Sequence, residues 1–416
     1  MNSYARFIIV FTTFVVYWQT SSILADNLRY AHFGADAILY FSLAEKQIHD
    51  HVMLFHPVTG MLALGWMEVL GPLTAVMTPY ALLNALFAAV GAASVWVASA
   101  AFAAIAPRRY VLPLVLIYAS SLGIWYFASI AESKIITAFL SCLYVALYLH
   151  LRESWSNWRA AMLTVTLALA CLNEIVSGLL AVIPAVDTVL RHGFSPRRLR
   201  WVVLHVVPVP FMLLVMELFI NKYMLGPHAL AAGSDHFSLF LTYVGFGDHS
   251  LSSLYNYILN WFAFSLAAPS HYAISSVDAW PDYYGYFEPT ALGYFDSWVT
   301  MAAVLALAGL IALRLATPRQ PLQWQQMSLV AALMTYSLLR GVVFFLFVPP
   351  EGLLYSSAVV MVHIIVLFVL LFTPRYRTSN LILLFVLAIG IMLSNVRFLY
   401  FEKLQNTPII LPANGS

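Results

Sequence analysis

The chain has 416 residues, of which 62% are hydrophobic and only 9% are charged, whereas about a quarter of the residues in soluble domains are charged. A mean hydropathy of +0.84 and apolar stretches longer than about 18 residues indicate a polytopic helical membrane protein and disfavour a disordered chain, a disulfide scaffold or a β-barrel. The net charge of +2 argues against a nucleic-acid partner. Cys142 and Cys171 lie in apolar runs, which favours small buried residues over a disulfide or a metal site.

Long apolar runs predict the membrane crossings, because a segment in the hydrocarbon core must satisfy its own backbone hydrogen bonds as a helix. The 160–190 stretch is either one tilted helix or two short crossings that turn at Leu172-Asn173-Glu174. Two crossings place the arginine-rich loop at 191–200 inside, as the positive-inside tendency favours. We therefore predict one all-α membrane domain over 1–416 with about eleven crossings, at 6–24, 78–105, 110–128, 134–150, 160–172, 175–190, 201–221, 296–316, 325–348, 353–373 and 379–397.

Charge also predicts the orientation. The inner loops of this arrangement contain most of the 20 basic residues, all of them arginine there, while most of the 18 carboxylates fall outside or within the membrane segments. We expect a multi-pass protein of the cell inner (cytoplasmic) membrane with its N-terminus inside. Residues 6–24 could also be read as a signal peptide that ends before Asp26, but the charge distribution is consistent when they remain as the first crossing.

Two outer segments, 25–77 and 222–295, are too long to be ordinary connections, and such loops are usually functional. The apolar patch Leu254–Ala268 in the second segment predicts a helix that lies in the membrane interface, with Tyr255, Tyr257, Trp261 and Phe262 at headgroup level. A further pair of crossings is the alternative. No internal repeat is visible, which weakens a transporter built from inverted repeats.

The first outer loop concentrates ionisable side chains, with four carboxylates and four histidines in about 30 residues of a chain otherwise nearly free of charge. Such groups at a membrane boundary are functional candidates. If 36–47 is helical, Asp36 and Tyr40 lie one turn apart on one face; the alternative is an interfacial helix with a solvated polar face. His49-Asp50-His51 could converge on a divalent metal only in a loop, and we expect neither a metal nor another cofactor.

The order of these motifs resembles the GT-C superfamily of integral membrane glycosyltransferases, which use polyprenyl-phosphate sugars and include protein O-mannosyltransferases and aminoarabinose transferases. Gly-x-Asp-x-x-x-Tyr in the first outer loop is followed by His56-Pro57 and then by a helix with Leu82-Leu83-Asn84-Ala85-Leu86. The hairpin after Trp158-Arg159-Ala160-Ala161 and the junction at Pro349-Pro350-Glu351 also look like that superfamily. The resemblance covers about 1–190 and 296–397 and implies a GT-C-like bundle with interfacial helices in its outer loops.

The resemblance implies that Asp36 is the catalytic carboxylate and that the site faces the outer side. A carboxylate within hydrogen-bond reach can take the proton of the acceptor as the sugar carbon is attacked. Asp26 is the rival, because Asp26-Asn27-Leu28-Arg29-Tyr30-Ala31 resembles a run seen in some aminoarabinose transferases. Glu45 either orients the acceptor or is solvated.

The leaving phosphate needs positive charge as its bond breaks. Arg340 is the first candidate, because an unpaired charge inside an apolar helix would cost a few kcal/mol, and its alternative role is a structural pair with Glu351 or Glu217. The remaining predicted donor-binding residues are Lys46, Lys134, Arg397, Tyr40, His56 and Glu351.

The large outer loop is the predicted recognition segment for the acceptor or the sugar. Trp280, Asp282 and Tyr283 are its candidates, since aromatic rings stack on sugar faces while carboxylates bind hydroxyls; aromatic anchoring in the interface explains the same residues equally well. The expected partners are a polyprenyl-phosphate sugar, an acceptor that is a glycan, lipid or protein, and membrane lipids. A polymerase or ligase for polyprenyl-linked oligosaccharides and a lipid-linked sugar transporter or flippase are the competing functions.

Overall fold

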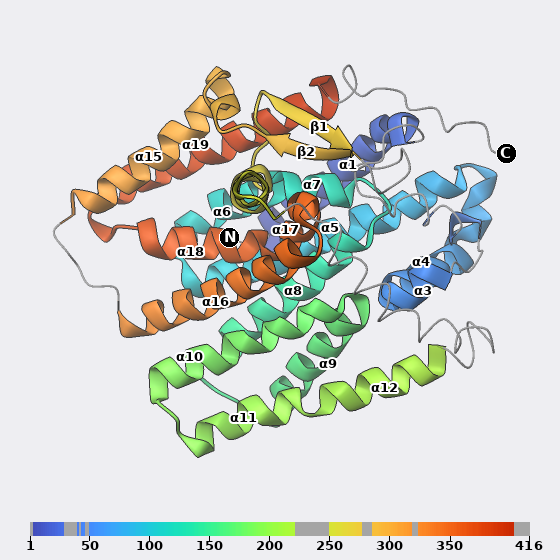
Figure 1. The fold of residues 1–416 in the computed structure, drawn as a ribbon, viewed down its shortest axis with the longest axis horizontal. Helices are drawn as coiled ribbons and strands as arrows, with labels where there is room; N and C mark the ends of the chain where they lie inside the picture. Colours follow the sequence, from blue (N-terminus) through green and yellow to red (C-terminus); the bar gives the residue numbers. More distant parts are fainter. Residues whose placement is uncertain are drawn as a thin grey trace.

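A computed structural model describes residues 3–28, 40, 43–45, 50–220, 249–276, 285–317 and 323–402 of the chain. These residues form a helical bundle with one two-stranded hairpin (Figure 1). The elements, in chain order, are α1 (Ser3–Leu28), α3 (Asp50–Phe55), α4 (Pro57–Leu70), η1 (Gly71–Ala75), α5 (Pro79–Ile105), α6 (Arg108–Ser120), α7 (Leu122–Ala128), α8 (Ser133–Leu151), α9 (Asn157–Asn173), η2 (Ile175–Ala181), α10 (Val182–His192), α11 (Pro196–Val206), α12 (Pro208–Ile220), α14 (Leu251–Ile258), η4 (Leu259–Phe264), β1 (Tyr272–Ser276), β2 (Gly285–Pro289), η5 (Leu292–Tyr294), α15 (Trp298–Leu315), α16 (Trp324–Phe347), η6 (Pro349–Glu351), α17 (Gly352–Ser356), η7 (Ser357–Val359), α18 (Val360–Leu371), η8 (Pro374–Tyr376), α19 (Arg377–Val396) and η9 (Arg397–Glu402).

Membrane crossing is supported by the length and composition of these helices. Ten described segments are long and apolar enough to span a bilayer, or eleven if the bent pair α6–α7 is counted as one span. The prediction of a polytopic helical membrane protein is therefore confirmed. The observed candidate spans differ from the predicted crossings in two places. Pro57–Ala75, which we predicted to lie within an outer loop, qualifies as a span, and α9 has 17 residues and is too short to qualify alone.

The predicted crossing at 110–128 is broken rather than continuous, because α6 and α7 meet at an angle of 56°. Ser121 adopts an extended backbone there, which frees the N–H groups of the next two residues. Leu122 N–H donates to the Leu266 carbonyl at 3.1 Å and Gly123 N–H to the Ser265 carbonyl at 2.8 Å. The chain after η4 thus supplies the acceptors that a kink at membrane depth requires.

The predicted turn at Leu172-Asn173-Glu174 is present. α9 ends at Asn173, Glu174 is extended with φ −160° and ψ 109°, and η2 then packs against α9. Two helical segments therefore replace the single tilted helix that the 160–190 stretch could also have formed.

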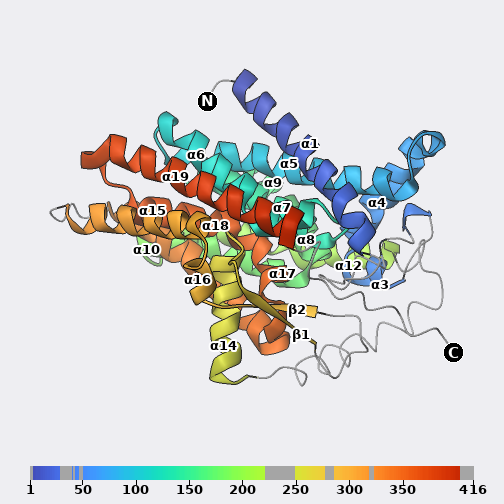
Figure 2. The ribbon, with the colours of Figure 1, turned by 90° about the horizontal axis from the view of Figure 1, so that it is seen from above.

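The arginine-rich loops gather at one end of the bundle, which we call the basic end. There Arg152 pairs with Asp187 at 2.6 Å and Arg191 with Glu153 at 3.0 Å, and Trp324 Nε1 donates to the Leu190 carbonyl at 2.9 Å. The start of α16 therefore lies beside the ends of α8 and α10. Figures 1 and 2 show α10 and α16 as neighbours from two directions. Segments that we predicted on one side of the membrane thus lie at one end of the molecule.

The segment Leu254–Ala268 corrects one prediction. It forms α14 and the π-helical turn η4, but Tyr257 and Trp261 are buried rather than placed at headgroup level. The Tyr257 hydroxyl donates to the Gly341 carbonyl at 2.9 Å, and Trp261 Nε1 donates to Ser337 Oγ at 3.3 Å. These two rings therefore cover α16. The same predicted loop also contains strands, since β1 and β2 pair antiparallel from Tyr272↔Pro289 to Ser276↔Gly285.

Close packing of α15 on α19 depends on Gly390. A Cβ built there would lie 2.9 Å from the Ala303 Cβ and 3.1 Å from the Ala303 nitrogen. We expect Gly390→Ala to destabilise the protein by about 1–2 kcal/mol, because either helix must shift. Gly65→Ala is the matched control, since a Cβ built there would meet no side chain or neighbouring element within 4 Å, and it should be neutral or slightly stabilising. Unfolding of both variants in detergent checks this, and equal effects would contradict it.

Candidate functional site

Arg340 is the centre of the candidate site. It lies in the second half of α16, is fully buried, and pairs through Nη2 with Glu174 Oε1 at 2.7 Å. This partner, Glu174, lies in the turn between α9 and η2 and is not one of the two that we considered, Glu351 and Glu217; the Glu217 side chain lies outside the described residues. The Nε and Nη1 groups of Arg340 have no hydrogen-bond partner, and neither does Glu174 Oε2. The pair therefore uses only part of its hydrogen-bonding capacity.

Lys134 supplies a second buried cation beside the first. It is the second residue of α8, is 2% exposed, and its Nζ lies 4.3 Å from the centroid of the Tyr355 ring. Tyr355 stacks on Phe344 with centroids 3.7 Å apart, and the Arg340 guanidinium carbon lies 4.9 Å from the centroid of the Phe344 ring. One aromatic stack thus contacts both cations through cation–π interactions.

Glu174 is the carboxylate whose ionised form these two cations stabilise. Burial alone raises the pKa of this carboxyl, but the charges of Arg340, Lys134 and His56 and the hydrogen bond from Arg340 outweigh it, so its pKa falls below the usual value. Glu174 is therefore ionised at neutral pH, and the group of Arg340, Lys134 and Glu174 has a net charge of +1. We call these three residues the charge cluster.

A hydrogen-bonded scaffold around Asn173 holds the charge cluster in place. The Asn173 Oδ1 accepts from the backbone N–H of Thr59 at 3.1 Å and from its hydroxyl at 2.7 Å, and Nδ2 donates to Thr137 Oγ1 at 2.9 Å and to the Ser133 carbonyl at 3.3 Å. His56 Nδ1 donates to the Asn173 carbonyl at 2.6 Å. One buried side chain therefore ties α4 and α8 to the end of α9, next to Glu174 and Lys134.

We expect Asn173→Ala to destabilise the protein by about 2–3 kcal/mol, because it leaves several buried donors and acceptors without partners. Thr59→Val removes only the 2.7 Å hydroxyl bond to Asn173 and should cost about 1 kcal/mol or less. Unfolding in detergent measures both. A smaller loss for Asn173→Ala than for Thr59→Val would contradict the bridging role.

Aromatic side chains of α16, α14 and η4 lie around Arg340. Tyr336, one turn earlier on α16, is fully buried and interacts electrostatically with Arg340. Tyr257 and Trp261 cover the adjoining Gly341, whose missing side chain lets the Trp261 ring approach to 3.4 Å of a Cβ position. α14 and η4 therefore separate the charge cluster from the surroundings on that side.

The structure brings together three of the predicted donor-binding residues, Arg340, Lys134 and His56. Glu351 is half-buried in η6, just before α17, which contains Tyr355. Arg397 lies apart from the charge cluster and donates to the Ser270 carbonyl at 3.4 Å.

The other predicted residues are less informative. Tyr40 is fully buried and packs edge-on against Phe87 of α5, with ring centroids 6.1 Å apart, and Glu45 is exposed. Outside the described residues lie Asp36, Lys46, His49, Trp280, Asp282, Tyr283 and the side chain of Asp26.

Sequence reasoning missed Glu174, Asn173 and Tyr336. Glu174 carried a usable signal, because a carboxylate in the middle of a 31-residue apolar stretch requires a partner, yet we treated Asn173 and Glu174 only as a turn. Within the described residues, no three His, Cys, Asp or Glu side chains are grouped so that they could hold a metal ion.

No protein-family model, curated protein or solved structure matches the chain. The fold and the site therefore define its class directly: a polytopic helical membrane protein with a buried, net cationic cluster where α8, α9 and α16 meet.

Proposed function

We propose that the chain is a membrane glycosyltransferase of GT-C type, which moves a sugar from a polyprenyl-phosphate donor to an acceptor on the outer face of the inner membrane. One observation carries the proposal. Two buried cations, Arg340 and Lys134, face one carboxylate, and two donor groups of the guanidinium are unused. A phosphate fits this arrangement, because guanidinium N–H groups bind its oxygens as a fork and an ammonium adds a point charge.

The proposed role of the charge cluster is to stabilise the leaving group. When the bond between the sugar carbon and the phosphate oxygen breaks, the electron pair stays on the phosphate, and fixed positive charge in a dry site stabilises it more than water would. Because Arg340 is fully buried, donor binding must displace part of what covers it. We assign this movement to α14 and η4, which cover Arg340 through Tyr257 and Trp261.

The proposed base is Asp36, with Asp26 as the alternative. Its carboxylate takes the proton of the acceptor hydroxyl or amine while the acceptor atom bonds to the sugar carbon. The hydrogen bonds of His56 and Thr59 to Asn173 support this assignment, because they hold the start of α4, which follows the Asp36 segment in sequence, at the helix end beside Glu174. Glu45, Trp280, Asp282 and Tyr283 remain the proposed acceptor-binding residues.

A lipid-linked sugar transporter is the second candidate, favoured by the same ion pair. Arg340 and Glu174 are buried between helices of a membrane bundle, where ionisable residues often mark a transport pathway. The two functions differ in chemistry, since a transferase cleaves the donor and a transporter leaves it intact.

The test uses purified protein in vesicles that contain radiolabelled polyprenyl-phosphate sugars, with candidate glycan, lipid and peptide acceptors added. The proposal predicts that free polyprenyl phosphate and a labelled acceptor appear together. Movement of intact donor across the vesicle membrane without cleavage would instead establish the transporter. Arg340→Met/Glu174→Met protein is the matched control and should support neither release nor transfer.

A further inference from the structure

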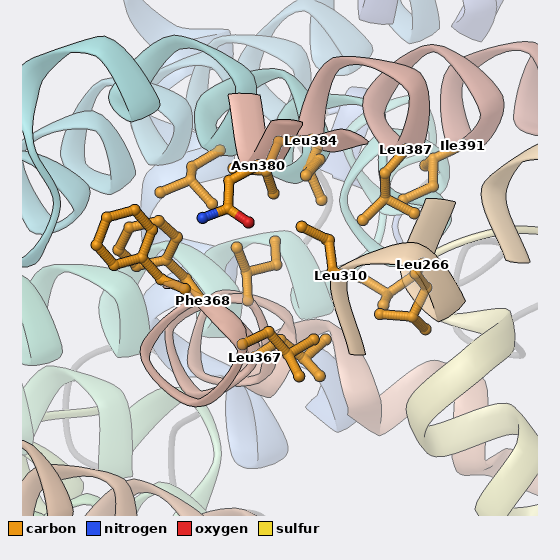
Figure 3. A pocket seen from close by; sticks show the side chains of 14 residues that line it. Leu266, Leu310, Leu367, Phe368, Asn380, Leu384, Leu387 and Ile391 are labelled. Atoms are coloured by element: carbon orange, nitrogen blue, oxygen red, sulfur yellow. The ribbon is translucent and has the colours of Figure 1, made fainter. Parts of the chain in front are cut away.

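An apolar groove lies between α6, α15, α18 and α19 and shares no residue with the charge cluster. The space between its side chains is about 590 Å³ when the part open to the surroundings is included, and Asn380 is the only polar residue among those lining it. Figure 3 shows side chains such as Leu310, Phe368 and Leu387 around this space. α15, α18 and α19 are in candidate membrane spans, and α6 belongs to the bent one. An apolar groove between membrane-spanning helices is suited to bind the acyl chain of a lipid.

Asn380 gives the groove one polar end. Its Nδ2 donates to the Thr373 carbonyl at 2.7 Å and to Thr373 Oγ1 at 3.3 Å, which fixes the carboxamide. Its Oδ1 is fully buried and has no hydrogen-bond partner, and such acceptors are rare in folded proteins. In Figure 3 the carboxamide is directed into the groove between Phe368 and Leu310. A ligand hydroxyl next to the lipid chain would satisfy this oxygen.

Four exposed arginines lie where the groove-lining helices α6 and α19 begin, which for α19 is one turn from Asn380: Arg108, Arg109, Arg375 and Arg377. Among the described residues, none of them forms an ion pair. Tyr110 connects the arginines to the lining. Its hydroxyl donates to the Arg377 carbonyl at 2.9 Å, and its ring packs on Phe372 with centroids 4.9 Å apart.

We propose that this groove and its arginines form a binding site for an anionic phospholipid. One acyl chain lies in the groove, the phosphate lies against the arginines, and a headgroup hydroxyl donates to Asn380 Oδ1. Basic pockets between membrane helices bind anionic headgroups in this way. The site is independent of the glycosyltransferase proposal, because it rests on different residues at the other end of α18 from Tyr355 and Lys134.

The first test compares binding of phosphatidylglycerol and phosphatidylcholine with the same chains to the purified full chain, by native mass spectrometry in detergent. We expect phosphatidylglycerol to bind more tightly. Arg375→Gln/Arg377→Gln should weaken it about 25-fold, since each cation at a lipid surface contributes about fivefold. The matched control is Arg159→Gln/Arg200→Gln, two exposed arginines outside the groove, and it should stay within about twofold of wild type. Equal effects of the two double variants, or equal binding of the two lipids, would overturn the proposal.

The second test addresses the acyl chain. Leu387→Trp fills the groove from α19 and should weaken phosphatidylglycerol binding at least tenfold, whereas Leu387→Met, which conserves volume, should not. Leu307→Trp fills it from α15 and replaces Leu387→Trp if that variant does not fold. Glycerol phosphate, which has the charge but no chain, should not bind measurably. Unchanged lipid binding in a folded tryptophan variant, or glycerol phosphate binding as tightly as the lipid, would show that the groove is not the chain site.

Discussion

Arg340→Met should destabilise the protein by about 3–5 kcal/mol, because it leaves the Glu174 carboxylate buried without its hydrogen-bonded partner. The loss should fall toward the lower end of that range, since Lys134 still lowers the energy of the Glu174 charge. Unfolding in detergent with increasing denaturant measures it.

The double variant Arg340→Met/Glu174→Met separates structure from function. Replacement of both members of a buried ion pair by apolar residues of similar volume is often neutral or stabilising, so this protein should unfold within about 1 kcal/mol of wild type. It should nevertheless have lost donor cleavage. A stable double variant that still cleaves the donor would show that the pair is purely structural, and a double variant as unstable as Arg340→Met would contradict the account of the pair.

Asp36→Asn should lower sugar transfer by about 10²–10⁴-fold, the usual contribution of a general base. The substitution removes the proton acceptor and conserves side-chain volume. Transfer of labelled sugar to the acceptor by purified protein measures it, at matched protein levels. Glu68→Gln is the control, because it removes an exposed carboxylate of α4 in the same predicted loop, and it should change transfer less than about twofold.

Asp26→Asn is the second arm of that experiment. If Asp36→Asn is active and Asp26→Asn is not, the base is Asp26 and the proposed chemistry stands. If both variants transfer sugar at the wild-type rate, a carboxylate base from this loop is not part of the mechanism.

The membrane crossings could be predicted because apolar length is a local property of the sequence. The side of the arginine-rich loops could also be predicted, because the charge of a loop is a local property of the sequence. Arg152, Arg191 and Arg377 do lie at one end of the bundle. Pro57–Ala75 was assigned to a loop with the charged and histidine residues that precede it in sequence, although its own composition is apolar enough for a span.

The site was only partly predictable. Arg340 stood out because one charge in an apolar helix is conspicuous, but its partner depends on how α16 packs against the turn after α9, and no local pattern contains that information. The burial of Tyr257 and Trp261 was missed for a related reason. Aromatic residues that anchor a helix in the interface and aromatic residues that cover a buried arginine have the same composition, and only the neighbouring helix distinguishes them.

The central claim is that the charge cluster binds the phosphate of the donor. An experimental structure of the full chain with bound polyprenyl phosphate tests it most directly. The account predicts phosphate density within about 3 Å of Arg340 Nε and Nη1 and close to Lys134 Nζ, the range of charge-assisted hydrogen bonds, with α14 and η4 displaced. Phosphate bound elsewhere, with the Arg340–Glu174 pair still enclosed by Tyr257 and Trp261, would contradict it.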